Sequence, residues 1–244
     1  MVCRETATGT VGDVNDWRTA LRVATWNVLA ERYALAERYG YTENGTFDER
    51  GRRVLDTVLG VIERHDVVVL QEVEEWLVSA LDPYVVGWAP HPGSPVGVAT
   101  LSRHGAITTR VDVIGGRATL VSAFDLGGVV VEVIGAHLRW SGDAGVMREQ
   151  AAGLAQLVHG GPGVLAADAN AAWSSAALEP LRRAGWTSDT DRDSAYVDGR
   201  WRALDVIAVL GGEARSSVEA GDVVIPSPRW PSDHRVVSAT ATFR

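Results

Sequence analysis

Short apolar segments of strand length, separated by Gly, Pro and Asp, occupy most of this chain. In residues 21–30, LRVATWNVLA, apolar side chains fall on both alternating faces, as in a strand that is covered on its two sides. The segments at 67–70 (VVVL) and 163–166 (GVLA) have the same character. Strands that are buried on both faces require further layers of structure above and below them, so the chain is predicted to form a layered domain.

Helical periodicity separates several of these strands. Residues 47–64 carry Val, Leu and Ile on one face and charged residues on the other, and residues 144–159 are also amphipathic. Shorter helices are predicted at 74–81 and 175–185. Residues 84–139 instead indicate a meander of mainly antiparallel strands.

The chain ends in two further predicted strands, at 203–210 and 234–243. Two groups of strands, each with helices on one side only, predict a four-layer α/β/β/α sandwich, in which two packed, mainly antiparallel sheets have helices outside. Residues 1–18 are polar and irregular and are predicted to be a flexible lead-in. Residues 19–244 are predicted to form a single domain.

The composition excludes several classes of function. All 23 basic residues are Arg, so the chain has no Walker lysine, Schiff-base lysine or lysine nucleophile. Cys3 is the only cysteine, which excludes a disulfide framework and a thiolate metal cluster and fits a reducing cytoplasm. The formal net charge of -8 predicts no overall attraction to nucleic acid, and no segment approaches the ~20 apolar residues of a membrane span. We expect a soluble, cytoplasmic monomer with no membrane partner.

Most of the apolar segments end in an acidic, amide or imidazole side chain. Each such residue alone could be a turn residue, because strand ends adjoin turns in which Asn and Asp bind local backbone. Carboxylates and amide oxygens are also the ligands that Mg²⁺ accepts, and imidazoles suit charge stabilisation and proton transfer in phosphate ester hydrolysis. Asp168 and Asn170, two positions apart, are predicted to point to one face of a strand. The full set is Asn27, Glu72, His137, Asp168, Asn170, Asp205, Asp233 and His234.

The ordered motifs TWNV, LQEV, AHL, ADAN, ALDVI and PSDH resemble those of the endonuclease/exonuclease/phosphatase superfamily, which includes DNase I. The resemblance extends over residues 21–243 and implies a DNase I-like fold and in-line attack of water on a phosphate ester. It also implies Mg²⁺ as the cofactor, with Mn²⁺ able to replace it. By the same resemblance, Glu72 is similar to the principal metal ligand, and Asn27 and Asp233 complete the metal shell.

The resemblance implies catalytic roles for the remaining motif residues. Asp168 is similar to the residue that orients and deprotonates the attacking water, and Asn170 to the residue that holds a phosphate oxygen. His234, oriented by Asp205, resembles the histidine that contacts the scissile phosphate. His137 would reach the phosphate or the leaving-group oxygen.

The first motif, TWNVLAERYA, resembles the deadenylase, nocturnin and Angel branch of the superfamily, whose members act on RNA 3′ ends. This implies a nucleic-acid substrate, RNA or a single-stranded end, and either 3′ exonuclease activity or hydrolysis of a 2′,3′-cyclic phosphate. Arg32, in the polar loop that follows, and Trp173, after the ADAN motif, are the predicted substrate-binding residues, through a guanidinium group and a stacking ring. Trp173 could equally pack beneath a loop.

Other functions stay open at this point. One is a DNA endonuclease or exonuclease of the exonuclease III or DNase I type, although Leu29 stands where relatives of exonuclease III usually place an acid. Another is a phosphatase for small or lipid phosphates, although no apolar hairpin or basic membrane face supports it. A third is a catalytically inactive binding module on the same fold. His91 lies away from the motifs and is predicted to occupy a loop or the surface.

Overall fold

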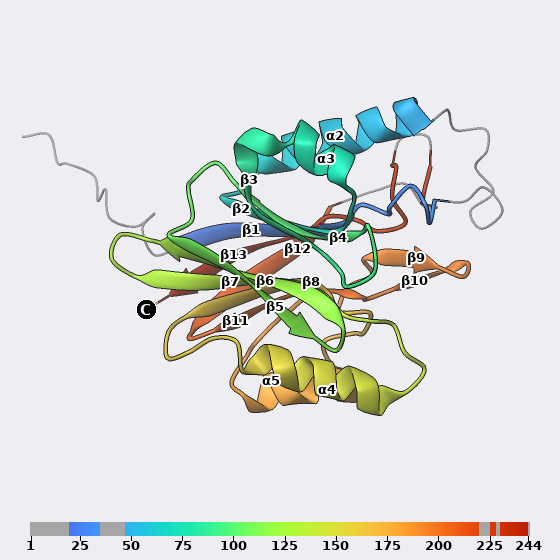
Figure 1. Ribbon diagram of the computed structural model, residues 1–244. Coiled ribbons are helices and arrows are strands. Elements are labelled where there is room, and N and C mark those ends of the chain that lie inside the picture. Colours follow the sequence, from blue (N-terminus) through green and yellow to red (C-terminus); the bar gives the residue numbers. More distant parts are fainter. Residues whose placement is uncertain (1–19, 35–46, 220–224, 228–229, 244) are drawn as a thin grey trace, which may run out of the picture.

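In a computed structural model of the chain, which describes residues 20–34, 47–219, 225–227 and 230–243, two β-sheets lie face to face between two layers of helices (Figure 1). The predicted four-layer sandwich is therefore confirmed. The expected lead-in at residues 1–18, with Cys3, lies outside the described residues. None of the described helices is long and apolar enough to cross a membrane.

The first sheet has six strands, of which only the central pair is parallel. In order across the sheet, they are β12 (Gly212–Val218), β13 (Val237–Phe243), β1 (Ala20–Asn27), β2 (Val67–Val73), β4 (Gly97–Ser102) and β3 (Val85–Pro90). Strands β1 and β2 run parallel, and Asn27 lies opposite Gln71 where β1 ends. Parallel strands end at the same edge of a sheet, so the polar residues at the ends of β1 and β2 become neighbours.

The second sheet has five strands and also contains one parallel pair. In order, they are β11 (Asp205–Leu210), β8 (Gly163–Asp168), β7 (Val130–His137), β6 (Arg117–Asp125) and β5 (Thr108–Ile114). In the parallel pair of β7 and β8, His137 lies opposite Asp168. On the other side of β8, Asp205 also lies opposite Asp168, because β11 runs antiparallel and begins where β8 ends.

The helices form the two outer layers (Figure 1). Helices α2 (Phe47–Arg64) and α3 (Glu75–Ala80) cover the first sheet, and α4 (Ala144–Ala155) and α5 (Glu179–Arg183) cover the second. Three of the four predicted helices match these elements. The predicted helix at 175–185 is instead a 3₁₀ turn (Ala176–Leu178) followed by the short α5, with Pro180 in its first turn, where proline is tolerated.

Strand β1 is apolar on both faces because each face packs in a different layer of the core. Leu21 and Val23 point into the core between the two sheets, whereas Ala24 and Trp26 pack beneath α2. All four side chains are buried. The alternation therefore places Asn27, the last residue of β1, at the edge where both apolar layers end.

Two features of the fold differ from the sequence prediction. The predicted meander at 84–139 is divided, since β3 and β4 belong to the first sheet and β5, β6 and β7 to the second. Strand alternation specifies buried faces but not the sheet to which a strand belongs, which is why the division was missed. The sequence prediction also lacked strand β12 and a small hairpin of β9 (Ala195–Val197) and β10 (Arg200–Arg202).

Candidate active site

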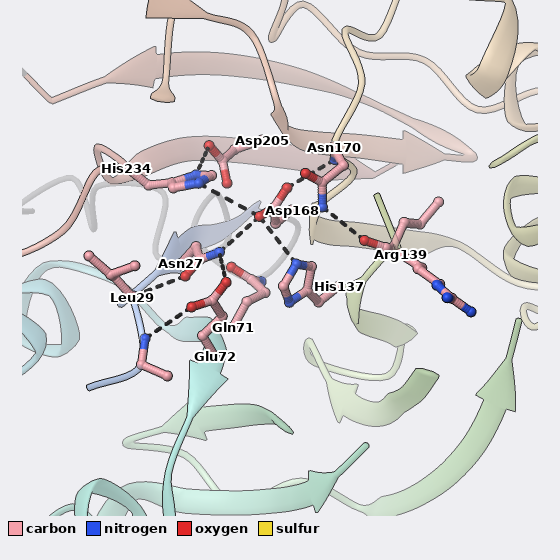
Figure 2. A network of polar contacts seen from close by, with 12 residues as sticks. Asn27, Leu29, Gln71, Glu72, His137, Arg139, Asp168, Asn170, Asp205 and His234 are labelled. Atoms are coloured by element: carbon pink, nitrogen blue, oxygen red, sulfur yellow. Dashed lines mark hydrogen bonds and ion pairs between the residues drawn. The ribbon is translucent and has the colours of Figure 1, made fainter. Parts of the chain in front are cut away.

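The polar residues predicted from the strand ends converge on one pocket of about 400 Å³ (Figure 2). They come from both sheets, because β1 and β2 end beside β7, β8 and the start of β11. Seven of the eight predicted polar residues line the pocket, and the eighth, Asp205, lies behind them, bonded to His234. The lining set comprises Asn27, Glu72, His137, Asp168, Asn170, Asp233 and His234.

 Asp233 adjoins His234 in the segment that precedes β13.

Asp168 lies at the centre of the site and is 1% exposed. Its Oδ2 accepts a hydrogen bond of 2.9 Å from Asn27 Nδ2 and lies 3.5 Å from His137 Nε2 and 3.8 Å from His234 Nε2. Burial alone would raise the pKa of Asp168, but the two imidazoles and the hydrogen bonds from Asn27 and Asn170 outweigh burial and lower it. Asp168 is therefore held as a carboxylate between two histidines.

His234 is oriented from both its side chain and its backbone. Its Nδ1 makes a 2.8 Å hydrogen bond with Asp205 Oδ2, and its carbonyl oxygen accepts hydrogen bonds from the indoles of Trp26 and Trp230. Burial alone would lower the pKa of His234, but the neighbouring carboxylates Asp205 and Asp168 raise it well above its ordinary value. The ring is thus fixed and bears a proton, with Nε2 directed towards Asp168 (Figure 2).

Glu72 lies in an irregular part of β2, where the register shifts between Gln71 and Val73. Its Oε1 accepts a hydrogen bond of 3.1 Å from Asn27 Nδ2, and its Oε2 accepts one of 3.0 Å from the Ala30 backbone amide. A carboxylate oxygen can accept more than one such bond, so both oxygens keep the capacity to bind a cation in the pocket. This donor chemistry fits Mg²⁺, which prefers carboxylate and amide oxygens.

Asn27 connects the two principal carboxylates of the site. Its amide nitrogen donates to both Glu72 and Asp168, while its Oδ1 accepts a 2.9 Å hydrogen bond from the Leu29 backbone amide. Asn27 therefore fixes the spacing between the end of β2 and the end of β8. Its Oδ1 keeps one lone pair beyond the bond to Leu29 and can therefore still bind a cation. The role of Asn27 as a metal ligand stays a prediction.

A second group of side chains could also hold a divalent cation. Ligand atoms of Asp168, Asp205 and His234 all lie within 4.8 Å of one another, and all three residues are buried. The hydrogen bond between His234 and Asp205 already occupies one imidazole nitrogen of this group. Asp168, Asp205 and His234 are therefore a second candidate site for a divalent cation. Glu72 is not a member of this group and is connected to it through the hydrogen bonds of Asn27.

Backbone conformations that disfavour ordinary side chains are concentrated at this pocket. Among the described residues other than glycine, positive φ angles occur at Leu29 (56°), Glu72 (57°), Asn170 (50°) and Asp198 (50°). All four line the pocket. Such residues persist where the surrounding structure holds them, and they are frequent at active sites and ligand clamps.

Asn170 reaches the pocket by a turn and not by strand alternation. Strand β8 ends at Asp168, and the Asn170 backbone amide donates a 2.9 Å hydrogen bond back to Asp168 Oδ1. Its side-chain nitrogen donates to the Leu138 carbonyl oxygen at 2.9 Å. The two residues are neighbours as expected, but the prediction that both belong to one face of the strand was wrong, because the chain turns directly after Asp168.

The structure does not bring the two predicted substrate-binding residues to the pocket. Trp173 is 7% exposed and packs in the apolar core beneath α4 and α5, with the Arg182 guanidinium 5.8 Å from its ring. Arg32 is exposed, lies 5.5 Å over the ring of Tyr33 and is not among the residues that line the pocket. The neighbouring Tyr33 does line it.

The sequence prediction missed pocket residues that lie outside the motifs. Arg117 at the start of β6, Trp140 after β7, and Asp198 and Arg202 in the hairpin of β9 and β10 all line the pocket. The Asp198–Gly199 pair is a hairpin signal that could have revealed this wall from the sequence. The hairpin is joined to the segment of His234 by a β-bridge between Ala195 and His234.

His91 lies in the loop between β3 and β4, which agrees with the predicted loop position, but it is buried behind the site and not on the surface. The side chain is 2% exposed, and its ring packs edge-on against His137 with 5.8 Å between the ring centroids. Its Nδ1 accepts a 3.1 Å hydrogen bond from the Ala118 backbone amide, so the ring is neutral with its proton on Nε2. Burial, together with the positive charges of Arg117 and His137, lowers the pKa of His91 to about 3.

This neutral histidine predicts a defined sensitivity of the fold to acid. Below a pH of about 6.5 the unfolded chain binds a proton at His91 that the folded protein does not bind until a pH of about 3, so stability falls as the pH falls. From pH 6.5 to 5, the loss due to His91 is roughly 2 kcal/mol. Urea unfolding at both pH values should show a smaller loss for His91→Asn, whose oxygen can still accept from Ala118. An equal loss in both proteins would refute the assignment.

Arg50 joins segments of the chain that border the pocket. Its guanidinium forms a 3.0 Å ion pair with Glu31 and donates hydrogen bonds to the carbonyl oxygens of Val28, Leu29 and Pro231. The side chain is buried, unlike its exposed neighbour Arg52.

Replacement of Arg50 is expected to destabilise the protein. Arg50→Met leaves buried carbonyl oxygens without donors and Glu31 without its partner, and should lower the free energy of unfolding by about 3 kcal/mol. The measurement is urea denaturation, with Arg52→Met on the exposed face of α2 as the matched control. A loss no larger than that of the control would contradict the structural role of Arg50.

The model of the Endonuclease/Exonuclease/phosphatase family matches residues 24–234. Comparison with curated protein sequences gives no match. Similar solved structures include the human Nocturnin catalytic domain with a bound sulfate anion, which has a TM-score of 0.68 and 18% sequence identity over 93% of this chain and 96% of that one.

Two further structures have the same fold. ANGEL2, described as a 2′,3′-cyclic phosphatase and bound to adenosine-2′,3′-vanadate, has a TM-score of 0.72 at 14% identity, over 91% of this chain and 96% of its own. An endonuclease/exonuclease/phosphatase from Bacteroides vulgatus has a TM-score of 0.70 at 17% identity, over 93% of this chain and 100% of its own. At these identities the likeness establishes the DNase I-like architecture.

Proposed function

The chain belongs to the endonuclease/exonuclease/phosphatase family of hydrolases, and we propose that it is a Mg²⁺-dependent phosphoesterase that acts on the 3′ end of RNA. The observation that carries this proposal is the position of Asp168, a buried carboxylate held between two imidazoles and joined through Asn27 to Glu72. This arrangement supplies a base, proton-bearing groups and a cation site around one pocket.

Glu72 is the principal metal ligand in this proposal, with Asn27 and Asp233 beside it. The ordered family motifs support this assignment, and so does the unused acceptor capacity of the Glu72 oxygens. The alternative group of Asp168, Asp205 and His234 is less suited, since a cation would have to displace the proton shared by His234 and Asp205. Mg²⁺, or Mn²⁺ in its place, would neutralise negative charge on the phosphate.

The side chains of the pocket then divide the chemical work. Asp168 orients a water molecule and takes its proton, and His234, held by Asp205, stabilises the negative charge that develops on the phosphoryl oxygens. Asn170 holds a phosphate oxygen, and His137 reaches the phosphate or the oxygen of the leaving group. The attack is in line and involves no covalent enzyme intermediate.

RNA is proposed as the substrate on two grounds. The motif TWNVLAERYA resembles the branch that acts on RNA 3′ ends, and the solved structures of similar fold include Nocturnin and a 2′,3′-cyclic phosphatase. Leu29 at the position of an acid in relatives of exonuclease III disfavours an abasic-site nuclease. That the protein works as a cytoplasmic monomer stays a prediction, whereas Arg32 and Trp173, which do not line the pocket, are given no role in substrate binding.

A panel of nucleic-acid ends tests the proposal. Oligoribonucleotides that end in a 3′-hydroxyl, a 3′-phosphate, a 2′,3′-cyclic phosphate or poly(A) are incubated with Mg²⁺ or Mn²⁺ beside plain and abasic duplex DNA and a soluble phosphoinositide. We expect metal-dependent hydrolysis of at least one RNA end at a rate above that of every other substrate. Preferential hydrolysis of duplex DNA or of the phosphoinositide would contradict RNA as the substrate and identify that other class instead. No hydrolysis at all would favour an inactive binding module.

A further inference from the structure

Two arginines that line the pocket have no partner among the described residues. Neither the guanidinium of Arg117 nor that of Arg202 makes a hydrogen bond or ion pair with the part of the chain that the structure describes. The Nε of Arg202 is buried and unpartnered. Arg50, by contrast, is bound to four groups.

The absence of pairing is notable because the pocket is rich in carboxylates. Glu72, Asp168, Asp198 and Asp233 all line it, yet none of them is paired with Arg117 or Arg202. A guanidinium group that stays unpaired at a pocket keeps its planar set of donors available for an incoming anion, and phosphate is the anion that this geometry matches well.

The two arginines lie on different sides of the catalytic side chains. Arg117 immediately precedes Ala118, whose backbone amide donates to His91, the ring that packs against His137. Arg202 closes the hairpin strand β10, and its carbonyl oxygen accepts from the amide of Ser194, whose hydroxyl in turn accepts from the amide of Asp205. Arg117 is therefore on the His137 side and Arg202 on the side of Asp205 and His234.

Aromatic side chains lie at the same pocket. Tyr33 and Trp140 line it and are 37% and 59% exposed. Exposed rings beside guanidinium groups are the combination with which proteins bind single-stranded nucleic acid, through stacking on bases and contacts with the backbone. The pocket thus offers more recognition groups than one phosphate ester requires.

We propose that Arg117 and Arg202 bind phosphate groups other than the scissile one, so that the substrate is a nucleic-acid strand of several nucleotides. This inference rests on the proposed function, because it takes the catalytic centre as the place of the scissile phosphate. It assigns substrate binding to two residues outside the family motifs. A mononucleotide or a small phosphate ester would leave both guanidinium groups without a ligand.

The test measures binding of a fluorescein-labelled hexaribonucleotide by anisotropy with Mg²⁺, in an Asp168→Asn background that prevents cleavage. Arg117→Gln and Arg202→Gln are compared singly and together, with Arg200→Gln as the matched control. Arg200 is exposed on the same hairpin and does not line the pocket. Thermal unfolding checks that each variant is folded.

We expect the double variant to bind at least tenfold more weakly, while Arg200→Gln binds like the background protein. The slope of log K against log salt should also become shallower by ~0.7 for each arginine removed, the value for one contact with a single-stranded phosphate. Unchanged affinity and slope in the double variant, or no binding by the background protein, would overturn the inference.

The outcomes separate this inference from the proposed function. If the original protein hydrolyses RNA ends but the double variant binds the strand unchanged, the inference fails and the proposed function stands. If the strand binds through the two arginines but no phosphoester is hydrolysed under any metal, the protein is a binding module and the catalytic proposal fails.

Discussion

Asp168→Asn is expected to lower kcat/KM by roughly 10³-fold or more on the best substrate of the panel. The change removes the group proposed to take a proton from water, and it removes the negative charge that faces both His137 and His234. The amide is nearly the same size as the carboxylate, but it has a single oxygen, so it can keep only one of the two hydrogen bonds, the bond that Asn27 donates to Oδ2 or the bond that Asn170 donates to Oδ1. Steady-state kinetics with Mg²⁺ provide the measurement.

Asp56→Asn is the matched control for this variant, because Asp56 is exposed on α2, lies outside the motifs and does not line the pocket. It makes the same chemical change and should leave kcat/KM within twofold of that of the original protein. Thermal unfolding of Asp168→Asn should show a cooperative transition. Activity of the Asp168 variant within tenfold of the original protein would remove Asp168 from the role of base.

Asp205→Asn is the second change with a large expected effect. Asp205 Oδ2 makes the 2.8 Å hydrogen bond that fixes His234, and an amide nitrogen in its place would oppose the proton on His234 Nδ1. By analogy with other buried aspartate–histidine pairs, kcat should fall by about 10²- to 10⁴-fold. KM should change little, since Asp205 does not line the pocket.

The split between kcat and KM distinguishes an orienting role from a structural one. His234→Gln should lower kcat to a similar level. The double variant should have a kcat no lower than that of the less active single variant, because both changes disable the same Asp205–His234 pair. Additive losses in the double variant would show that Asp205 acts independently of His234. A rise in KM with unchanged kcat in Asp205→Asn would also contradict the orienting role.

The convergence of the site could be predicted because it follows from local rules. Asn27 and His137 end apolar strands, Asp168 ends another, and parallel neighbours bring such ends to one edge of each sheet. The two amphipathic helices were recognisable for the same reason, since their periodicity is contained in contiguous sequence.

Features that depend on contacts between distant segments could not be predicted in this way. The transfer of the chain from the first sheet after β4 to the second at β5 is set by tertiary packing and leaves no mark on strand alternation. His91 gave no signal, because its importance comes from the ring of His137, which lies 46 positions later in the chain. Trp173 could not be placed either, since a tryptophan beside a motif is equally compatible with a core and with a rim.

Metal-dependent hydrolysis of bis(4-nitrophenyl) phosphate, a phosphodiester without nucleic-acid features, tests the central claim most directly. Chelated protein should release no nitrophenolate, and added Mg²⁺ or Mn²⁺ should restore release in a saturable manner. In Glu72→Gln the metal concentration for half-maximal rate should rise at least tenfold, because one principal oxygen ligand is lost. Hydrolysis that survives chelation, or a Glu72→Gln variant with an unchanged metal requirement, would contradict a metal-dependent phosphoesterase centred on Glu72 and Asp168.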